Sequence, residues 1–178
     1  MVPTGDGVKS RDALALVANL TTQSFRSADE AIQAVLAALQ HITGLDTTLV
    51  SRIDRSTSEL RVLAAHNASP SLTVPAGLQI PLRMSPCHRV AGSDQPFICA
   101  DMREDPELAV LPAAKDLGAC AYVGVPVVLA DGSFFGTLAG LNTAPQGDLD
   151  RHLHWMQILV QLAAFQLERQ RGRPSSGA

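Results

Sequence analysis

The stretch from residue 121 to residue 142 constrains the fold more than any other, because it contains the longest β-strand pattern in the chain. Apolar side chains occupy every second position of its first half, namely Ala121, Val123, Val125, Val127 and Leu129. This alternation is typical of a strand with one buried face. Asp131-Gly132 then predicts a two-residue type I′ turn, since glycine readily adopts a positive φ. A β-hairpin is therefore expected here.

The return strand of this hairpin is expected to present two different faces. One face carries Phe135, Thr137, Ala139 and Leu141, and the other carries Phe134, Gly136, Leu138 and Gly140. Glycine inside a strand marks a bend or a close approach to the backbone. We therefore expect another element, or a ligand, to lie close to the chain at Gly136 and Gly140.

Further strands and short helices are predicted in the middle of the chain. β-Branched and apolar side chains favour strands, which are predicted at 47–54, 59–66, 77–82 and 97–100. Ser85-Pro86 resembles an N-cap followed by proline in the first helical turn. Short helices are expected at 87–91 and 108–117.

Longer helices are predicted near both ends. Residues 11–25 place apolar side chains on one stripe. Ser27 and Glu30 match a capping box, and Gly44 is placed to end the helix that follows. Residues 148–171 predict a third helix.

These elements predict an α+β fold with a central antiparallel sheet of five to six strands. The two hairpins should be neighbours in the sheet, with the terminal helices on one face and the irregular middle segment, 77–118, on the other. We expect an N-terminal helix and extension at 1–24, one domain at 25–170, and a flexible tail or linker at 171–178.

Composition excludes several classes of function. The net charge is −3 and the pI about 5.9, so the chain lacks the basic character of nucleic-acid-binding proteins. It has no apolar run of about 18 residues, so no membrane span is expected, and no secretory signal is evident at its N-terminus. Its three cysteines are an odd number and favour a cytoplasmic location.

The sequence resembles the GAF domain family over roughly residues 25–170. In the large hairpin the resemblance rests on Tyr122-Val123-Gly124-Val125-Pro126, Asp131-Gly132, Gly136-Thr137-Leu138 and Leu141-Asn142. In the middle segment it rests on Ser85-Pro86-Cys87 with Val90, and on Pro96, Asp101 and Asp105-Pro106. GAF domains are similar to PAS domains, so the resemblance implies a PAS-like fold.

The resemblance implies a non-catalytic sensor that binds a small ligand, dimerises, or does both. It also implies regulation of an output domain in bacterial signal transduction, such as a kinase or a cyclic-dinucleotide enzyme. A pure dimerisation module without a ligand remains an alternative. In the family, the ligand cavity lies between the sheet and the irregular segment. The candidate lining residues are Ile80, Cys87, His88, Val90, Asp101, Leu111, Tyr122 and Thr137.

Cys87 is the most suggestive single residue, because a thiol at a helix N-terminus can be activated by the helix dipole. The cofactor is left unassigned. A bilin or haem is considered, but no motif supports either. In phytochrome-like GAF domains the attachment cysteine usually follows the loop that contains the aspartate, and residues 106–118 contain no cysteine. A small packed cysteine is the simpler interpretation of Cys87.

An enzymatic alternative follows from the same resemblance. Free methionine-(R)-sulfoxide reductases are GAF domains with redox cysteines, and this chain has Cys87, Cys99 and Cys120. Cys120 is expected on the central strand, whereas the reductases need a cysteine in the loop before it. Gly124 stands near the place of their acidic residue, and Asn142 replaces an aspartate common at the end of the last strand.

No metal site and no other catalytic motif is predicted. His152 and His154 are two positions apart on a helix and so point to different sides. The carboxylates of Asp101, Glu104 and Asp105 are expected in a solvated turn. No catalytic residue is assigned.

The last helix carries a heptad-like pattern that predicts a homodimer. Its apolar positions recur in alternating steps of four and three residues, at Leu149, Leu153, Met156, Val160, Ala163 and Leu167. Such a pattern is typical of a seam between helices of two subunits. It is also compatible with a helix packed on the sheet of its own subunit.

Overall fold

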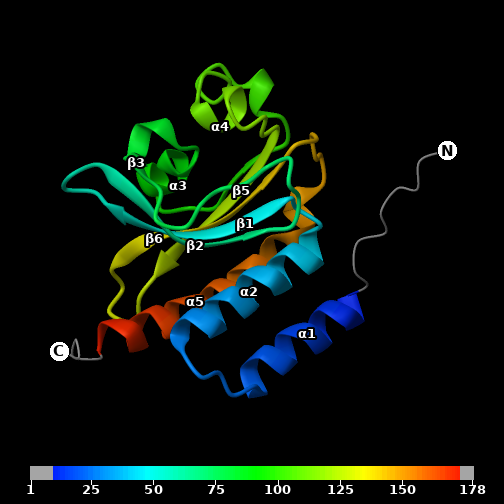
Figure 1. The fold of residues 1–178 in the computed structure, drawn as a ribbon, viewed down its shortest axis with the longest axis vertical. Helices are drawn as coiled ribbons and strands as arrows, with labels where there is room; N and C mark the ends of the chain where they lie inside the picture. Colours follow the sequence, from blue (N-terminus) through cyan, green and yellow to red (C-terminus); the bar gives the residue numbers. More distant parts are fainter. Residues whose placement is uncertain (1–9, 173–178) are drawn as a thin grey trace.

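The computed structural model describes residues 10–172 and shows a six-stranded antiparallel sheet (Figure 1). The strands are β1 (Thr47–Asp54), β2 (Glu59–Asn67), β3 (Gln79–Pro81), β4 (Phe97–Cys99), β5 (Ala121–Val128) and β6 (Phe134–Asn142). Their order in the sheet is β3-β2-β1-β6-β5-β4. β1 pairs with β6, so the two hairpins are neighbours, as predicted.

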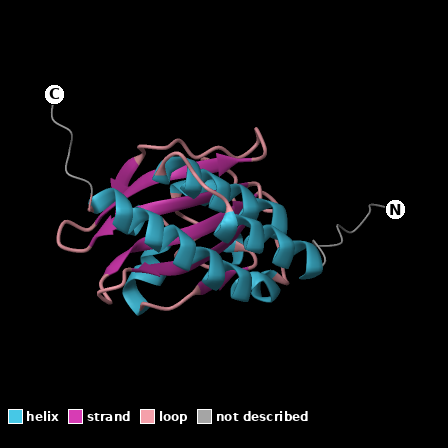
Figure 2. Cartoon of the chain, turned by 90° about the horizontal axis from the view of Figure 1, so that it is seen from below, coloured by secondary structure: helices cyan, strands magenta, loops and turns pink. Residues whose placement is uncertain are grey.

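Helices cover both faces of the sheet, but in different ways. The long helices are α1 (Ser10–Thr22), α2 (Ala28–Thr43) and α5 (Leu153–Arg171), and they lie on one face (Figures 1 and 2). The other face is covered by short helices, namely η1 (Leu82–Met84), α3 (Cys87–Ser93), η2 (Met102–Glu104) and α4 (Pro112–Lys115). One further short helix, η3 (Leu149–His152), precedes α5. We call the two sides the helix face and the cavity face. The predicted α+β architecture is confirmed.

The predicted signals at the ends of α2 are present. The Ser27 side chain accepts a hydrogen bond from the backbone N–H of Glu30, at 3.1 Å. Gly44 adopts φ 70° at the end of the helix, and its N–H donates to the carbonyl of Gln40. The Glu30 carboxylate accepts from the N–H of Arg26 and not of Ser27, so only half of the capping box forms.

The turn of the large hairpin is longer than predicted. The N–H of Leu129 donates to the carbonyl of Ser133, which closes a loop with three residues between them. Gly132 has φ 81°, whereas Asp131 does not adopt a positive φ. A type I′ turn needs positive φ at both central residues. The two-residue turn is therefore wrong, and Asp131 instead accepts hydrogen bonds from Ser133 through its side chain.

A register shift between Val127 and Val128 corrects the predicted faces of β6. Thr137, Ala139 and Leu141 lie together on the cavity face of the sheet. Phe134, however, joins this side, and Phe135 packs into the helix-face core. A β-bulge inserts one extra residue into a strand, so every side chain beyond it changes face.

The predicted dimer seam faces the inside of the chain. Leu149, Met156, Val160, Ala163 and Leu167 are between 0% and 4% exposed, and partly buried Leu153 packs beside them. They belong to the helix-face core, where α5 packs on α2 and β5. Side chains buried in this way are not available to a second subunit, so the seam was assigned to the wrong surface.

Within residues 10–172, none of the helices combines the length and the apolar character needed to cross a bilayer. The predicted tail at 171–178 lies, from residue 173 onward, outside the described residues.

Candidate functional site

A cavity of about 290 Å³ lies between the cavity face of the sheet and the irregular segment. Its floor is formed by β1, β2, β5 and β6, which contribute Leu49, Leu60, Val62, Tyr122, Ala139 and Leu141. The loop before β3 and β3 itself supply Thr73, Val74, Pro75, Leu78 and Ile80. The opposite wall comes from Met84, Ser85, Pro86, Cys87, Pro112, Ala113, Asp116 and Leu117.

The lining is almost entirely apolar. Asp116 is its one ionisable carboxylate, and it lies at the exposed end of α4. No lysine, arginine or histidine is among the lining residues in the described part of the chain. The volume is at the lower end of the range for small-molecule pockets, which are commonly apolar with a few polar groups. The arrangement suits a small, apolar ligand.

The predicted lining residues fall into three groups. Ile80, Cys87 and Tyr122 line the cavity. Val90, Leu111 and Thr137 are buried nearby, the first two in the apolar cluster beneath the cavity and Thr137 behind Cys87. His88 and Asp101 lie outside the cavity, because the short helices that carry them direct both side chains toward other polar groups.

The buried sulfur of Cys87 is surrounded by hydroxyl groups that form hydrogen bonds. The hydroxyls of Tyr122 and Thr137 each donate to Cys87 Sγ, both at 3.3 Å. Thr137 also shares a hydrogen bond of 2.7 Å with Ser51. Burial, and next the neighbouring Cys87, raise the pKa of Tyr122 well above its usual value. The tyrosine is therefore a neutral hydrogen-bond donor at the cavity floor.

Gly124 makes room for this tyrosine. A Cβ atom at position 124 would collide with the Tyr122 hydroxyl, because residues two apart on a strand share a face. The sequence alone does not indicate this role for Gly124. Only the position of the Tyr122 ring reveals its function in the site.

The three cysteines are separate and free. Cys87 is 3% exposed, and burial raises the pKa of the half-buried Cys99 thiol. Cys120 lies directly before β5 and not on the strand, which corrects the prediction. Only Cys87 is part of the cavity wall.

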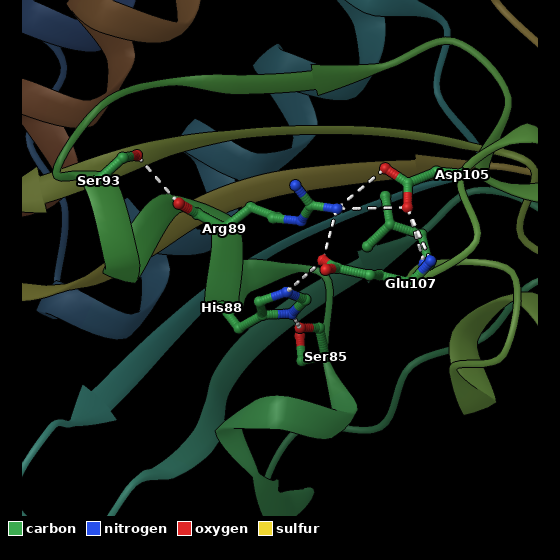
Figure 3. A network of polar contacts seen from close by, with 7 residues as sticks. Ser85, His88, Arg89, Ser93, Asp105 and Glu107 are labelled. Atoms are coloured by element: carbon green, nitrogen blue, oxygen red, sulfur yellow. Dashed lines mark hydrogen bonds and ion pairs between the residues drawn. The ribbon is translucent and has the colours of Figure 1, made fainter.

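The polar residues next to the cavity form an ion cluster (Figure 3). Nη2 of Arg89, on α3, lies 3.1 Å from Oδ2 of Asp105 and 2.7 Å from Oε2 of Glu107. His88 is tied to the carbonyl of Ser85 through Nδ1, at 2.8 Å. No group of three His, Cys, Asp or Glu side chains within residues 10–172 is arranged to hold a metal ion.

The cavity does not fit a tetrapyrrole cofactor. The lining contains no histidine to bind a haem iron, and its one thiol, Cys87, is buried and accepts two hydrogen bonds. A bilin thioether requires a thiol that the cofactor can reach. Neither a bilin nor haem is therefore assigned.

Several lining residues were not predicted. Leu49, Leu60 and Val62 alternate along β1 and β2, and this alternation was a usable signal. Leu78, Pro112 and Leu117 come from segments without a period. Their positions depend on how the irregular segment folds over the sheet.

Comparisons with known proteins agree with this architecture. The chain is 23% identical over 146 residues to the diguanylate cyclase DgcP of Escherichia coli K12, covering 82% of this chain and 41% of that protein. It therefore spans less than half of the length of that relative.

Solved structures show the same fold at low sequence identity. The phycocyanobilin-bound GAF domain of a cyanobacterial phytochrome is similar with a TM-score of 0.71 and 14% identity, over 89% of this chain and 95% of that one. The free methionine-R-sulfoxide reductase of Neisseria meningitidis, solved with its substrate, has a TM-score of 0.69 and 14% identity, over 90% and 89% of the two chains.

A family profile gives the assignment. The profile described as "GAF domain" matches residues 26–168, which include α2, most of α5 and the whole sheet. The match covers most of the chain, and the fold agrees with that of the similar structures. The chain therefore belongs to the GAF domain family.

Proposed function

We propose that this chain is a non-catalytic sensory domain that binds a small, apolar ligand without negative charge and regulates an output domain. The observation that carries the proposal is the apolar cavity of about 290 Å³ on the cavity face. Burial of apolar surface drives binding in such a site, while a few polar groups orient the ligand. The groups available here are Tyr122, Thr73, Ser85 and Asp116.

The charge of the lining argues against phosphate-bearing and other anionic ligands. Proteins bind phosphate through arginine, lysine or helix N-termini. The described lining has none of the basic side chains, and its one carboxylate, Asp116, repels anions. A neutral or cationic ligand is therefore favoured over a cyclic nucleotide.

The output domain is inferred from the similarity to a longer protein. The matched diguanylate cyclase is more than twice as long as the aligned region. A cyclic-dinucleotide enzyme or a kinase elsewhere in the polypeptide is the partner that we propose. The three free cysteines support a reducing compartment, and we place the domain in the cytoplasm.

A pair of fluorescent probes tests the ligand class. N-phenyl-1-naphthylamine is neutral, whereas 1-anilinonaphthalene-8-sulfonate has a similar ring system with a negative charge. We expect saturable binding of the neutral probe and much weaker binding of the anion. Ala113→Trp should abolish binding by filling the cavity, whereas Lys115→Trp, on the exposed side of the same helix, should not. Equal binding to both tryptophan variants would contradict the proposal.

A reductase activity is the second candidate, because Cys120 lies before β5, where the alternative requires it. Turnover of free methionine-(R)-sulfoxide with a thiol reductant is the direct assay. The apolar lining provides only Asp116 as a charged partner for an amino-acid substrate, which favours the sensor. Turnover abolished by Cys120→Ser would reverse this preference.

Self-association is proposed through a different surface from the predicted seam. Ile158 and Phe165, seven residues apart on the outer side of α5, are 42% and 56% exposed, and Leu14 on α1 is 61% exposed. Exposed large apolar side chains on neighbouring helices favour an interface. Sedimentation should show a concentration-dependent dimer that Phe165→Glu weakens and the control Gln161→Glu preserves. A wild type that stays monomeric throughout would exclude this interface.

A further inference from the structure

The cavity wall opposite the sheet consists of two separate segments. The first is residues 84–87, which join η1 to α3, and the second is residues 112–117, which contain α4. Met84 and Leu117 line the cavity and are each 36% exposed. In each segment, therefore, one apolar side chain both lines the cavity and is partly exposed to solvent. Access to the cavity depends on how these segments are held together.

The ion cluster of Figure 3 joins these segments beside the cavity. Arg89 extends from α3 to the carboxylates of Asp105 and Glu107, at 3.1 and 2.7 Å. Asp105 also accepts hydrogen bonds from the backbone N–H groups of Glu107 and Leu108, at 2.9 and 3.2 Å. Asp105 thereby fixes the turn that leads to α4, so one guanidinium group fastens α3 to the segment that carries the second wall.

Of the two segments, α3 is the one fixed to the rest of the domain. Arg55, at the end of β1, donates to the carbonyl of Ala91 at 2.7 Å and pairs with Asp94. These contacts hold the C-terminal end of α3 against the β1–β2 turn. Among the ion pairs of residues 10–172, only those of His88 and Arg89 reach the segment 105–117 from outside it. Leu108 and Leu111 of this segment are 0% and 6% exposed in the apolar cluster of the cavity face. We therefore expect its α4 end, residues 112–117, to move while α3 stays in place.

Arg89 is also in contact with the cavity floor through two aromatic rings. Its Cζ lies 5.4 Å from the ring centroid of Phe97. The Phe97 ring is 6.1 Å from that of Tyr122, whose hydroxyl donates to Cys87. A ligand that displaces Tyr122 would therefore disturb the surroundings of Arg89 through packed neighbours.

The cluster is only partly protected from water, which makes it reversible. The side chains of Arg89, Asp105 and Glu107 are 32%, 24% and 68% exposed. Salt screens ion pairs at such positions. In addition, Nε of Arg89 is buried without a hydrogen-bond partner among the described residues. Opening would return this donor to water and so offset part of the cost of breaking the ion pairs.

We propose that Arg89, Asp105 and Glu107 form a latch that holds residues 105–117 over the cavity and controls entry and release of the ligand. The inference rests on the proposed function, because it assigns a role to the same cavity. It predicts that the latch sets the rate of exchange more than the chemical selectivity, since none of the three residues lines the cavity.

The test compares Arg89→Gln with Arg103→Gln. Arg103 pairs with Asp101, two residues away, so its removal takes one arginine from the same region without separating the segments. Stopped-flow release of N-phenyl-1-naphthylamine should be about fivefold faster in Arg89→Gln and unchanged in Arg103→Gln. High salt should accelerate release from the wild type and have little effect on Arg89→Gln.

Hydrogen exchange without any ligand gives an independent measurement. Amides of residues 113–117 should exchange faster in Arg89→Gln, while those of α2 should not change. If Arg89→Gln fails to fold, Glu107→Gln provides the same test, because it removes the most exposed partner. Release and exchange rates equal to those of the wild type, or equal increases in Arg103→Gln, would overturn the latch. If the wild type binds no probe, the proposed function fails, and amide exchange alone decides whether the latch exists.

Discussion

The two faces of the sheet share the same strands but differ in what covers them. On the helix face, α2 and α5 have 16 and 19 residues, and their inner side chains, such as Leu36 and Met156, are 0% exposed. On the cavity face, α3 has seven residues and α4 has four. The cavity of about 290 Å³ lies on this second face.

This difference shows how a fold can keep an internal cavity without a large loss of stability. Long helices repeat their apolar positions with a constant period, so they fill the space above the sheet. Short segments with different directions do not fill it equally well. The helix face is therefore the more evenly packed side, and the cavity face keeps an internal space beside its own buried apolar cluster.

Two methionines provide the most direct comparison between the faces. Met156 is 0% exposed in the helix-face core, and Met84 is 36% exposed at the mouth of the cavity. We expect Met156→Ala to lower the free energy of unfolding by about 3 kcal/mol, and Met84→Ala by about 0.5 kcal/mol or less. Urea unfolding of both variants measures the difference. Similar losses would mean that the two faces are packed equally well.

Gly136 and Gly124 differ in what an added side chain would contact, which is backbone at Gly136 and another side chain at Gly124. A Cβ at Gly136 would collide with the backbone carbonyl of Ser51, which cannot move without shifting β1. A Cβ at Gly124 would meet the hydroxyl and ring edge of Tyr122, a side chain that borders the cavity and has space on that side. We expect Gly136→Ala to cost about 3 kcal/mol and Gly124→Ala about 1 kcal/mol. Thermal unfolding and probe titration should show that Gly124→Ala loses mainly probe binding; a larger stability loss in Gly124→Ala would contradict the packing at both sites.

At high pH, the change of stability with pH should depend on the ionisation of Tyr122, a residue of the cavity face. Tyr122 is the only tyrosine of the chain, and its pKa in the folded state is raised. Above a pH of about 10, the unfolded chain loses the tyrosine proton while the folded chain keeps it. The contribution of Tyr122 to stability should therefore fall above this pH, by at most about 1.4 kcal/mol per pH unit. Ultraviolet absorbance follows the ionisation, and Tyr122→Phe is the control. A folded protein that ionises near pH 10 would show that Tyr122 is not buried as described.

Much of the helix face could be predicted from the sequence, because its signals are local. Ser27 and Gly44 marked the ends of α2, and alternation marked β5. The seam of α5 was recognised as apolar but was assigned to a partner. A spacing of alternating four and three residues does not specify which surface covers it. The sheet and a second helix present equally apolar surfaces.

The cavity face could be predicted only in part. Cys87 and Tyr122 were identified through the family resemblance, whereas the lining from Leu78 and Leu117 depends on loops without a period. The sides of Phe134 and Phe135 were also unpredictable, because the bulge depends on the geometry of the adjoining turn. The same applies to Gly124, whose role depends on the rotamer of Tyr122.

The smallest expected effect concerns Cys87. Because its sulfur is buried and accepts two hydrogen bonds, Cys87→Ser should keep both bonds and cost about 1 kcal/mol or less. Thiol labelling of the folded protein should reach the half-buried Cys99 before Cys87. Mass spectrometry of the labelled peptides measures the order. Faster labelling of Cys87 would mean that the cavity wall formed by residues 84–87 opens readily to solvent.

The position of Tyr122 beside Val123 has a mechanical consequence. Successive side chains of a strand point to opposite faces, so Tyr122 lies on the cavity floor while Val123 packs in the core beneath α5 and α2. The two side chains are joined by a single peptide unit, so a ligand that displaced Tyr122 would also move Val123 against the helices. The distance from the cavity floor to the helix-face core is, at this point, the thickness of one pleat.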